Sequence, residues 1–85
     1  MAILSYRMMM LLDTIAKRNP DGSARDLDQI IETAGYKVSK QAIQFSLRSM
    51  IEKGVIEKMD RELRRDRVRT LYRATEYGLK CYKPV

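Results

Sequence analysis

The sequence predicts a small α+β domain in which three helices precede a two- or three-stranded β-sheet and a short C-terminal turn or helix. Three observations predict this fold class. Apolar residues recur at helical spacing in three segments before Gly54, a Val-Ile pair follows that glycine directly, and apolar and polar residues alternate over Arg67–Ala74. With 85 residues the chain has room for one small core, so we expect residues 1–85 to form a single domain.

The first segment predicts a helix over Ala2–Arg18. One face of this helix carries regularly spaced apolar residues, which are Leu4, Met8, Leu11, Leu12 and Ile15. Further apolar side chains point elsewhere on the helix, which is more apolar surface than a small monomer is expected to bury. We therefore expect a homodimer built on this helix, with contacts at Tyr6, Met9 and Met10. The alternative is that a three-helix core wraps the helix without a partner chain.

Turn and capping residues separate the next two helices. Asn19–Ser23 combines Asn, Pro, Asp and Gly, which predicts a turn, and Ser23 is the expected cap of a short second helix, with Asp26 three residues later. Ser39 is the expected cap of the third helix, and Gly54 its end. One face of the third helix is apolar. Its opposite face carries Lys40, Gln41, Gln44, Phe45 and Arg48.

Two strands are expected after the third helix. They are Val55–Met59 and Arg67–Ala74, with Asp60–Asp66 as the tip of the hairpin between them. The second segment alternates with a period of two and contains Val, Thr and Tyr, which strands favour. A long basic helix over Glu57–Arg73 is the alternative, because that segment is rich in helix-forming residues. Its apolar residues do not keep to one helical stripe, which favours the strands.

Basic residues are concentrated in the second half of the chain. The net charge is +6, but residues 1–36 hold 4 basic and 5 acidic residues, whereas residues 37–85 hold 13 and 6. Five arginines stand close together after the third helix: Arg61, Arg64, Arg65, Arg67 and Arg69. A basic surface confined to one part of a small domain favours a polyanionic partner such as nucleic acid.

Several function classes are excluded by the composition. The chain has no histidine, no glycine-rich phosphate loop and no metal-ligand cluster, and its single cysteine, Cys81, is expected to pack near the C-terminus. Its closely spaced carboxylates suit helix caps and hairpin charges better than catalysis. We therefore expect no metal, no cofactor and no enzymatic activity. The apolar run Met8–Leu12 is too short for a membrane span or a signal peptide, which predicts a cytoplasmic protein with no membrane partner.

The order of helix, glycine, strand, basic loop and second strand is that of a winged helix-turn-helix. The chain resembles this superfamily from about Asp26 to Gly78, and within it the MarR- and PadR-type bacterial regulators. The resemblance is carried by Ser39-x3-Ile43-x3-Leu47-x2-Met50-Ile51-Glu-Lys-Gly-Val-Ile56, by Arg-Arg-Asp-Arg67 and by Tyr72-Arg-Ala-Thr75-Glu-Tyr-Gly78. It implies that the third helix enters a major groove and that the hairpin, or wing, contacts phosphates or the minor groove.

These patterns together predict a sequence-preferring protein that binds double-stranded DNA and regulates transcription as a homodimer. The expected recognition-helix contacts are Ser39, Lys40, Gln41, Gln44, Phe45 and Arg48, and the expected wing contacts are Arg61, Arg64, Arg65, Arg67 and Arg69. Phe45 would either touch a thymine methyl group or pack inward if the helix is rotated. Two alternatives stay open: a winged helix that binds another protein, and an RNA-binding domain in a larger assembly.

Overall fold

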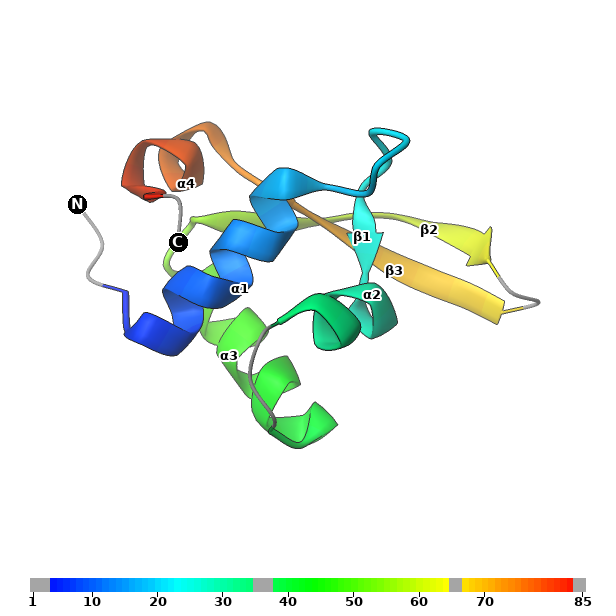
Figure 1. The fold of residues 1–85 in the computed structure, drawn as a ribbon, viewed down its shortest axis with the longest axis horizontal. Helices are drawn as coiled ribbons and strands as arrows, with labels where there is room; N and C mark the ends of the chain where they lie inside the picture. The colour runs from blue at the N-terminus through cyan, green and yellow to red at the C-terminus, as the bar shows by residue number, and fades with distance from the viewer. Residues whose placement is uncertain (1–3, 35–37, 65–66, 84–85) are drawn as a thin grey trace.

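The structure of the protein is a computed structural model, which describes residues 4–34, 38–64 and 67–83 (Figure 1). Its sheet is antiparallel and has the strand order β1-β3-β2. The predicted α+β class, with three helices before a hairpin, is confirmed. In chain order the elements are α1 (Tyr6–Lys17), β1 (Arg25–Asp26), α2 (Leu27–Thr33), α3 (Lys40–Glu52), β2 (Ile56–Arg64), β3 (Arg67–Ala74) and α4 (Glu76–Cys81).

Ser5 sets the start of α1. Its side-chain oxygen accepts a hydrogen bond from the backbone N–H of Met8 at 3.1 Å, which satisfies one of the unpaired donors at the helix terminus. The helix therefore begins at Tyr6, later than the predicted start at Ala2. It ends at Lys17, next to the predicted end at Arg18.

Asp26, and not Ser23, caps α2. The carboxylate of Asp26 accepts a hydrogen bond from the backbone N–H of Gln29 at 3.0 Å, and the side-chain oxygen of Gln29 accepts one from the backbone N–H of Asp26 at 3.1 Å. This reciprocal pair is a capping box. Ser23 instead closes the preceding turn, where its hydroxyl donates to the carboxylate of Asp21 at 2.7 Å. The predicted Ser23 cap is therefore wrong, because residues 25–26 are held in β1 and the helix starts after them.

The junction from α3 to β2 forms as predicted. The side-chain oxygen of Ser39 accepts a hydrogen bond from the backbone N–H of Ala42 at 3.2 Å, which caps α3. After α3 the chain turns at Gly54, whose φ of 79° lies in the left-handed region that glycine adopts without strain. The backbone N–H of Val55 then bonds to the carbonyl of Met50 at 3.2 Å, and β2 follows.

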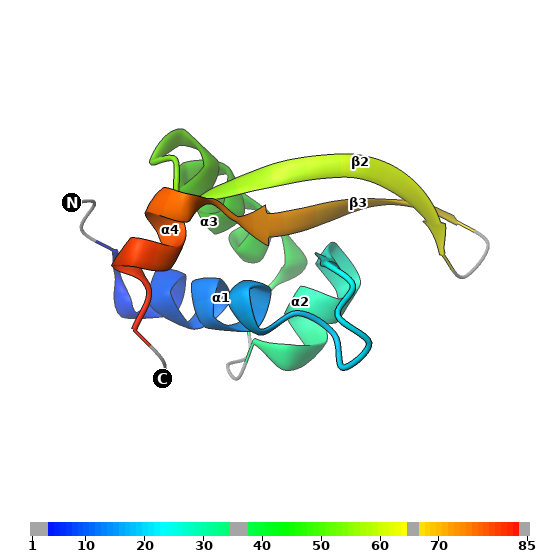
Figure 2. The ribbon, with the colours of Figure 1, turned by 90° about the horizontal axis from the view of Figure 1, so that it is seen from above.

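The β2–β3 hairpin, here called the wing, projects from the body of the molecule (Figures 1 and 2). The strand β2 is longer than predicted, since it continues through residues 60–64 of the expected tip. The alternative of a basic helix over Glu57–Arg73 is wrong, because residues across the wing pair from Ile56 with Ala74 out to Arg64 with Arg67. The register shifts between Lys58 and Arg61, which marks a bulge in β2.

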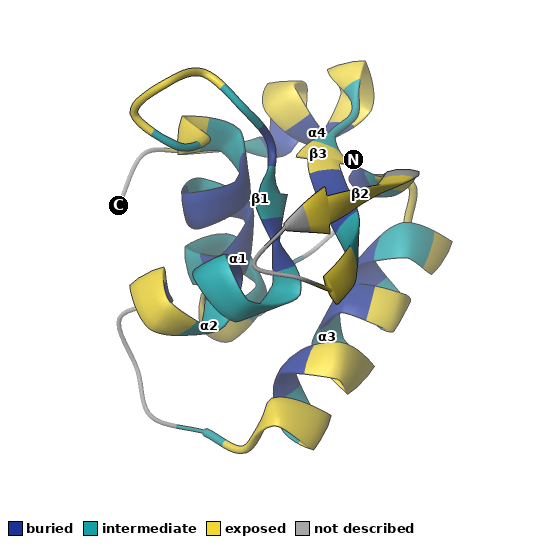
Figure 3. Cartoon of the chain, turned by 90° about the vertical axis from the view of Figure 1, so that its right-hand side faces the viewer, coloured by how far each residue is buried: buried dark blue, intermediate teal, exposed yellow. Residues whose placement is uncertain are grey.

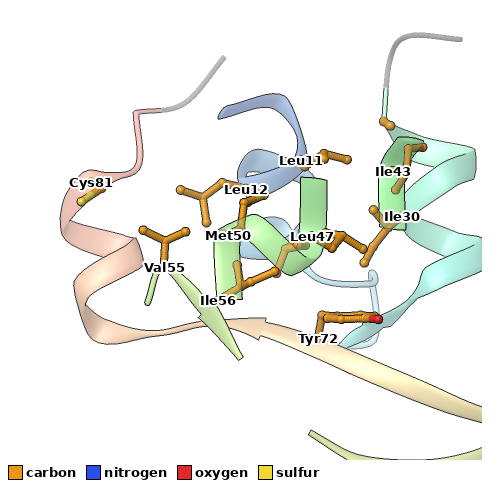
Figure 4. Close-up of a cluster of buried hydrophobic side chains, with 12 residues drawn as sticks. Leu11, Leu12, Ile30, Ile43, Leu47, Met50, Val55, Ile56, Tyr72 and Cys81 are labelled. Atoms are coloured by element: carbon orange, nitrogen blue, oxygen red, sulfur yellow. The ribbon is translucent and has the colours of Figure 1, made fainter. Parts of the chain in front are cut away.

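The core lies where the three N-terminal helices meet the base of the wing (Figure 4). Its fully buried side chains come from every one of these elements: Leu11, Leu12, Ile15, Ile30, Ile43, Leu47, Met50, Val55 and Ile56. Tyr72 of β3 and Cys81 of α4 complete the cluster. The predicted packing role of Cys81 is thus confirmed, because its side chain is 6% exposed.

The three residues expected at a dimer contact are not equally accessible. Met9 packs against the core, as the wrapping alternative for this helix supposes. Met10 is half-buried, and Tyr6 is 71% exposed. The homodimer stays a prediction. Among the described residues, no helix combines the length and the apolar character needed to cross a membrane.

Hydrogen bonds attach α4 to the turn at Gly54, which is called the corner below. The hydroxyl of Thr75 donates to the carbonyl of Gly54 at 2.6 Å and accepts from the backbone N–H of Gly78 at 2.9 Å, so that one side chain both caps α4 and holds it to the corner. The backbone N–H of Thr75 also bonds to the carbonyl of Val55 at 3.1 Å. As a result α4 and the start of α1 lie at the end of the molecule farthest from the wing tip (Figures 1 and 2).

The stability of the fold is expected to fall as the pH rises above about 10. A hydrogen bond to Asp13 raises the pKa of Tyr82 to about 12, and burial and the negative charge of Asp13 act in the same direction. Between the unfolded value of 10.0 and this folded value, Tyr82 stays protonated in the folded state but ionises in the unfolded state. The contribution of Tyr82 to the free energy of unfolding is therefore fully present below the unfolded pKa and is lost as the pH rises through the folded pKa.

A Tyr82→Phe variant provides the measurement. Denaturant midpoints at about pH 9 and about pH 11 should differ more for the wild type than for the variant, because the variant lacks the titrating hydroxyl. The other tyrosines contribute to both proteins and cancel, including Tyr72, whose pKa is raised by burial. An equal pH dependence in the two proteins would contradict the assigned role of the Tyr82–Asp13 bond.

Candidate nucleic-acid interface

The exposed face of α3 is the polar face that the spacing of its apolar residues predicts. All five polar-face residues are exposed, and Phe45 is 72% exposed. The alternative in which Phe45 packs inward is therefore wrong. Figure 3 shows exposed residues along the outward side of α3 and along the wing. Ser39 has a structural function here, since its side chain caps the helix.

The wing has two faces of different chemistry, which the strand register defines. Side chains directly opposite each other in paired strands lie on the same side of a sheet. The pairs Lys58 with Tyr72, Arg61 with Thr70 and Leu63 with Val68 therefore share one face. Because Lys58 and Tyr72 line a groove together with residues of α3, this face is the one that looks toward α3. We call it the inner face: Lys58, Arg61, Leu63, Val68, Thr70 and Tyr72.

The bulge in β2 decides which charges reach the inner face. In a regular strand successive side chains alternate, so residues 58 and 61 would lie on opposite faces. Because the register shifts between Lys58 and Arg61, both side chains lie on the inner face, and Glu62 lies on the opposite face. The inner face of the wing therefore carries two cations, and both are exposed.

The other side of the wing, the outer face, carries ion pairs. The guanidinium of Arg73 contacts the carboxylate of Glu57, and that of Arg69 contacts the carboxylate of Asp28 in α2. The Arg69 side chain is only 19% exposed, so this expected wing contact is a link between the wing and α2. Arg67 is exposed on the outer face. The side chains of Arg64 and Arg65 lie outside the described part of the structure, and their expected contacts stay predictions.

A groove of about 370 Å³ separates α3 from the inner face. Its lining combines the buried side chains of Leu47 and Tyr72 and the half-buried Ile51 with exposed polar residues, which are Gln44, Arg48, Glu52 and Lys58. Figure 4 shows Tyr72 between the wing ribbon and Leu47. A tyrosine hydroxyl is protonated at neutral pH and can donate a hydrogen bond, and burial raises the pKa of the Tyr72 phenol further.

Sequence reasoning found the rim of this groove on α3 but missed the part that the wing supplies. The sequence places Lys58 in the first strand and indicates no role for it, and it places Tyr72 only on the apolar side of the second strand. A signal was present, because Ile56 is apolar at a strand start and Lys58 lies two residues later, on the same face. The exposed Leu63–Val68 pair at the end of the wing was also missed.

A wider depression lies between the Asn19–Ser23 turn and the wing. It is lined by Asp21 and Glu62 together with neutral residues. Carboxylates repel phosphates, so this depression is unsuited to a polyanion. Within residues 4–34, 38–64 and 67–83, no group of three or more His, Cys, Asp or Glu side chains is arranged to hold a metal ion.

Residues 9–80 match the model of the ribonuclease R winged-helix domain. The chain belongs to the ribonuclease R winged-helix family. No curated protein matches it. The winged-helix expectation is therefore confirmed, whereas the resemblance to MarR- and PadR-type regulators is not confirmed beyond the fold.

Membership of the ribonuclease R winged-helix family corrects the expected function. The main expectation, a sequence-preferring regulator that binds double-stranded DNA, is wrong, because the matching family is named for a domain of a ribonuclease. The physical reason for the error is that a basic helix and a basic wing attract the phosphates of any nucleic acid. The element order showed the fold, but nothing in it selects DNA over RNA. The RNA-binding alternative agrees better with the family.

Proposed function

We propose that this ribonuclease R winged-helix domain binds RNA as a module of a larger RNA-processing assembly. The observation that carries the proposal is a basic surface made of the exposed face of α3 and the inner face of the wing, which line one groove together. It presents Lys40, Arg48, Lys58 and Arg61, which are all exposed. The family name, which is that of a ribonuclease, favours RNA as the polymer.

The distribution of acidic residues supports the same surface. On the outer face, Arg69 and Arg73 each contact a carboxylate. On the inner face, the paired positions opposite Lys58 and Arg61 are Tyr72 and Thr70, neither of which is acidic. A phosphate approaching the inner face therefore meets cations without an acidic cross-strand neighbour, which favours binding there.

Replacing Arg48 and Arg61 together with Ala is expected to weaken RNA binding by roughly tenfold or more at low salt, because two phosphate contacts are lost. The slope of log K against log salt should become shallower by roughly 0.7–0.9 for each lost phosphate contact. Fluorescence anisotropy of a labelled RNA hairpin, recorded over a range of salt concentrations, measures both quantities.

The matched control removes the same charge elsewhere. Arg73 on the outer face and Lys80 on α4 are also exposed, and an Arg73→Ala, Lys80→Ala variant has the same net charge as the test variant. It should retain most of the affinity and the salt slope. Equal losses in the two variants would show that only net charge matters. No binding to RNA by the wild type, or tighter binding to a DNA duplex of the same sequence, would overturn the proposal.

A further inference from the structure

The groove between α3 and the inner face of the wing has the size and chemistry of a site for one nucleotide. Its volume of about 370 Å³ falls at the small end of the range of roughly 300–1,000 Å³ that is typical of small-molecule sites. Apolar side chains form its floor and polar ones its rim, an arrangement that buries a flat ring while leaving its substituents hydrogen-bonded. This groove lies in the middle of the basic surface described above.

The lining suits a base with its phosphate. The half-buried Ile51 supplies apolar surface against which a base can pack, and the buried side chains of Leu47 and Tyr72 lie beneath it. The side-chain amide of Gln44 offers both a donor and acceptors to the edge of a base. Arg48 and Lys58 approach the groove from the helix and from the wing, which places a cation on each wall for a phosphate.

Glu52 adds a carboxylate to the described lining of the groove. This group repels a phosphate and accepts hydrogen bonds from base amino groups. The phosphate is therefore directed toward Arg48 and Lys58, and the base toward the apolar floor. A base in a helical stem is paired and stacked, so it has to leave the stem before it reaches this floor.

From this geometry we propose that the groove binds the base of one unpaired nucleotide, and that the domain therefore selects RNA with single-stranded or bulged positions over uninterrupted duplex. This inference rests on the proposed RNA binding and goes beyond it by naming the form of RNA. The rest of the basic surface holds the phosphates on either side of the unpaired position.

The test uses two RNA duplexes of the same sequence, one of which carries a single unpaired adenosine. The wild type should bind the bulged duplex more tightly by a factor of about five to one hundred, the range expected for one base packed against a protein surface. A Gln44→Trp variant, which fills the groove from its rim, should bring this ratio close to one. Leu79→Trp is the matched control, because Leu79 is exposed on α4 and does not line the groove.

A second measurement needs no variant. Addition of the bulged duplex should shift the methyl resonances of Leu47 and Ile51, whereas the uninterrupted duplex should leave them nearly unchanged. If the wild type binds both duplexes equally, or if both tryptophan variants lower the ratio alike, the groove is not a nucleotide site while RNA binding stands. If no RNA is bound at all, the proposed function fails together with this inference.

Discussion

The Gly78→Ala variant is expected to be largely unfolded at temperatures where the wild type is folded. A Cβ atom at this position would lie 1.9 Å from the carbonyl oxygen of Val55 and 2.8 Å from its carbonyl carbon. Both are backbone atoms, so no side-chain rotation relieves the overlap. The same carbonyl oxygen accepts the hydrogen bond from Thr75, and moving it disturbs the attachment of α4.

The expected cost of Gly78→Ala is about 3 kcal/mol or more, at the upper end for overpacked sites. In a domain of this size that corresponds to a fall in Tm of roughly 12–24 °C. Gly54→Ala is the control, since its φ of 79° imposes backbone strain but no atom lies within 4 Å of the added Cβ. It should cost about 1–2 kcal/mol. Thermal unfolding followed by circular dichroism compares the two. A Gly78→Ala variant as stable as the wild type would contradict the close contact between α4 and the corner.

A second large loss of stability is expected from Ile30→Ala. This side chain of α2 is fully buried in the core between the helices and the wing base. Truncation removes buried apolar surface and leaves a cavity, which costs roughly 2–5 kcal/mol. A small domain has only a few kcal/mol of net stability, so most molecules of the Ile30→Ala variant should be unfolded at about 37 °C.

The neighbouring residue provides the comparison for Ile30→Ala. Ile31 has the same side chain in the same helix but is only partly buried, at the edge of the core. Ile31→Ala should therefore cost clearly less than Ile30→Ala, and chemical denaturation of both variants measures the difference. If the order is reversed, α2 is rotated relative to the structure described above.

Local signals made most of the fold predictable. Ser39 and Gly54 act within one helical turn of their own positions, so the cap and the end of α3 can be read from sequence. The two-residue strand β1 cannot, because it exists only through pairing of Arg25 and Asp26 with Tyr72 and Leu71 far along the chain. The same long-range pairing explains why Asp26 caps α2 in place of the predicted Ser23.

The site was predictable on the helix and not on the wing. Helical periodicity separates the exposed face of α3 from Ile43 and Leu47 without knowledge of any other element. The arginines of the wing formed one set in the sequence, whereas the structure divides those it describes between two faces. That division depends on a bulge and on a partner in α2, Asp28, and neither leaves a local signature. The polymer could not be predicted either, because cations attract DNA and RNA phosphates alike.

The location of α4 and the start of α1, far from the wing tip, has a consequence for connectivity. A dye, a surface anchor or a neighbouring protein module placed beside α4 or the start of α1 lies at the opposite end of the molecule from the wing tip. A module attached in this way shares the bound polymer at a high effective concentration without competing for the same contacts. An attachment beside α4 therefore leaves the wing tip accessible.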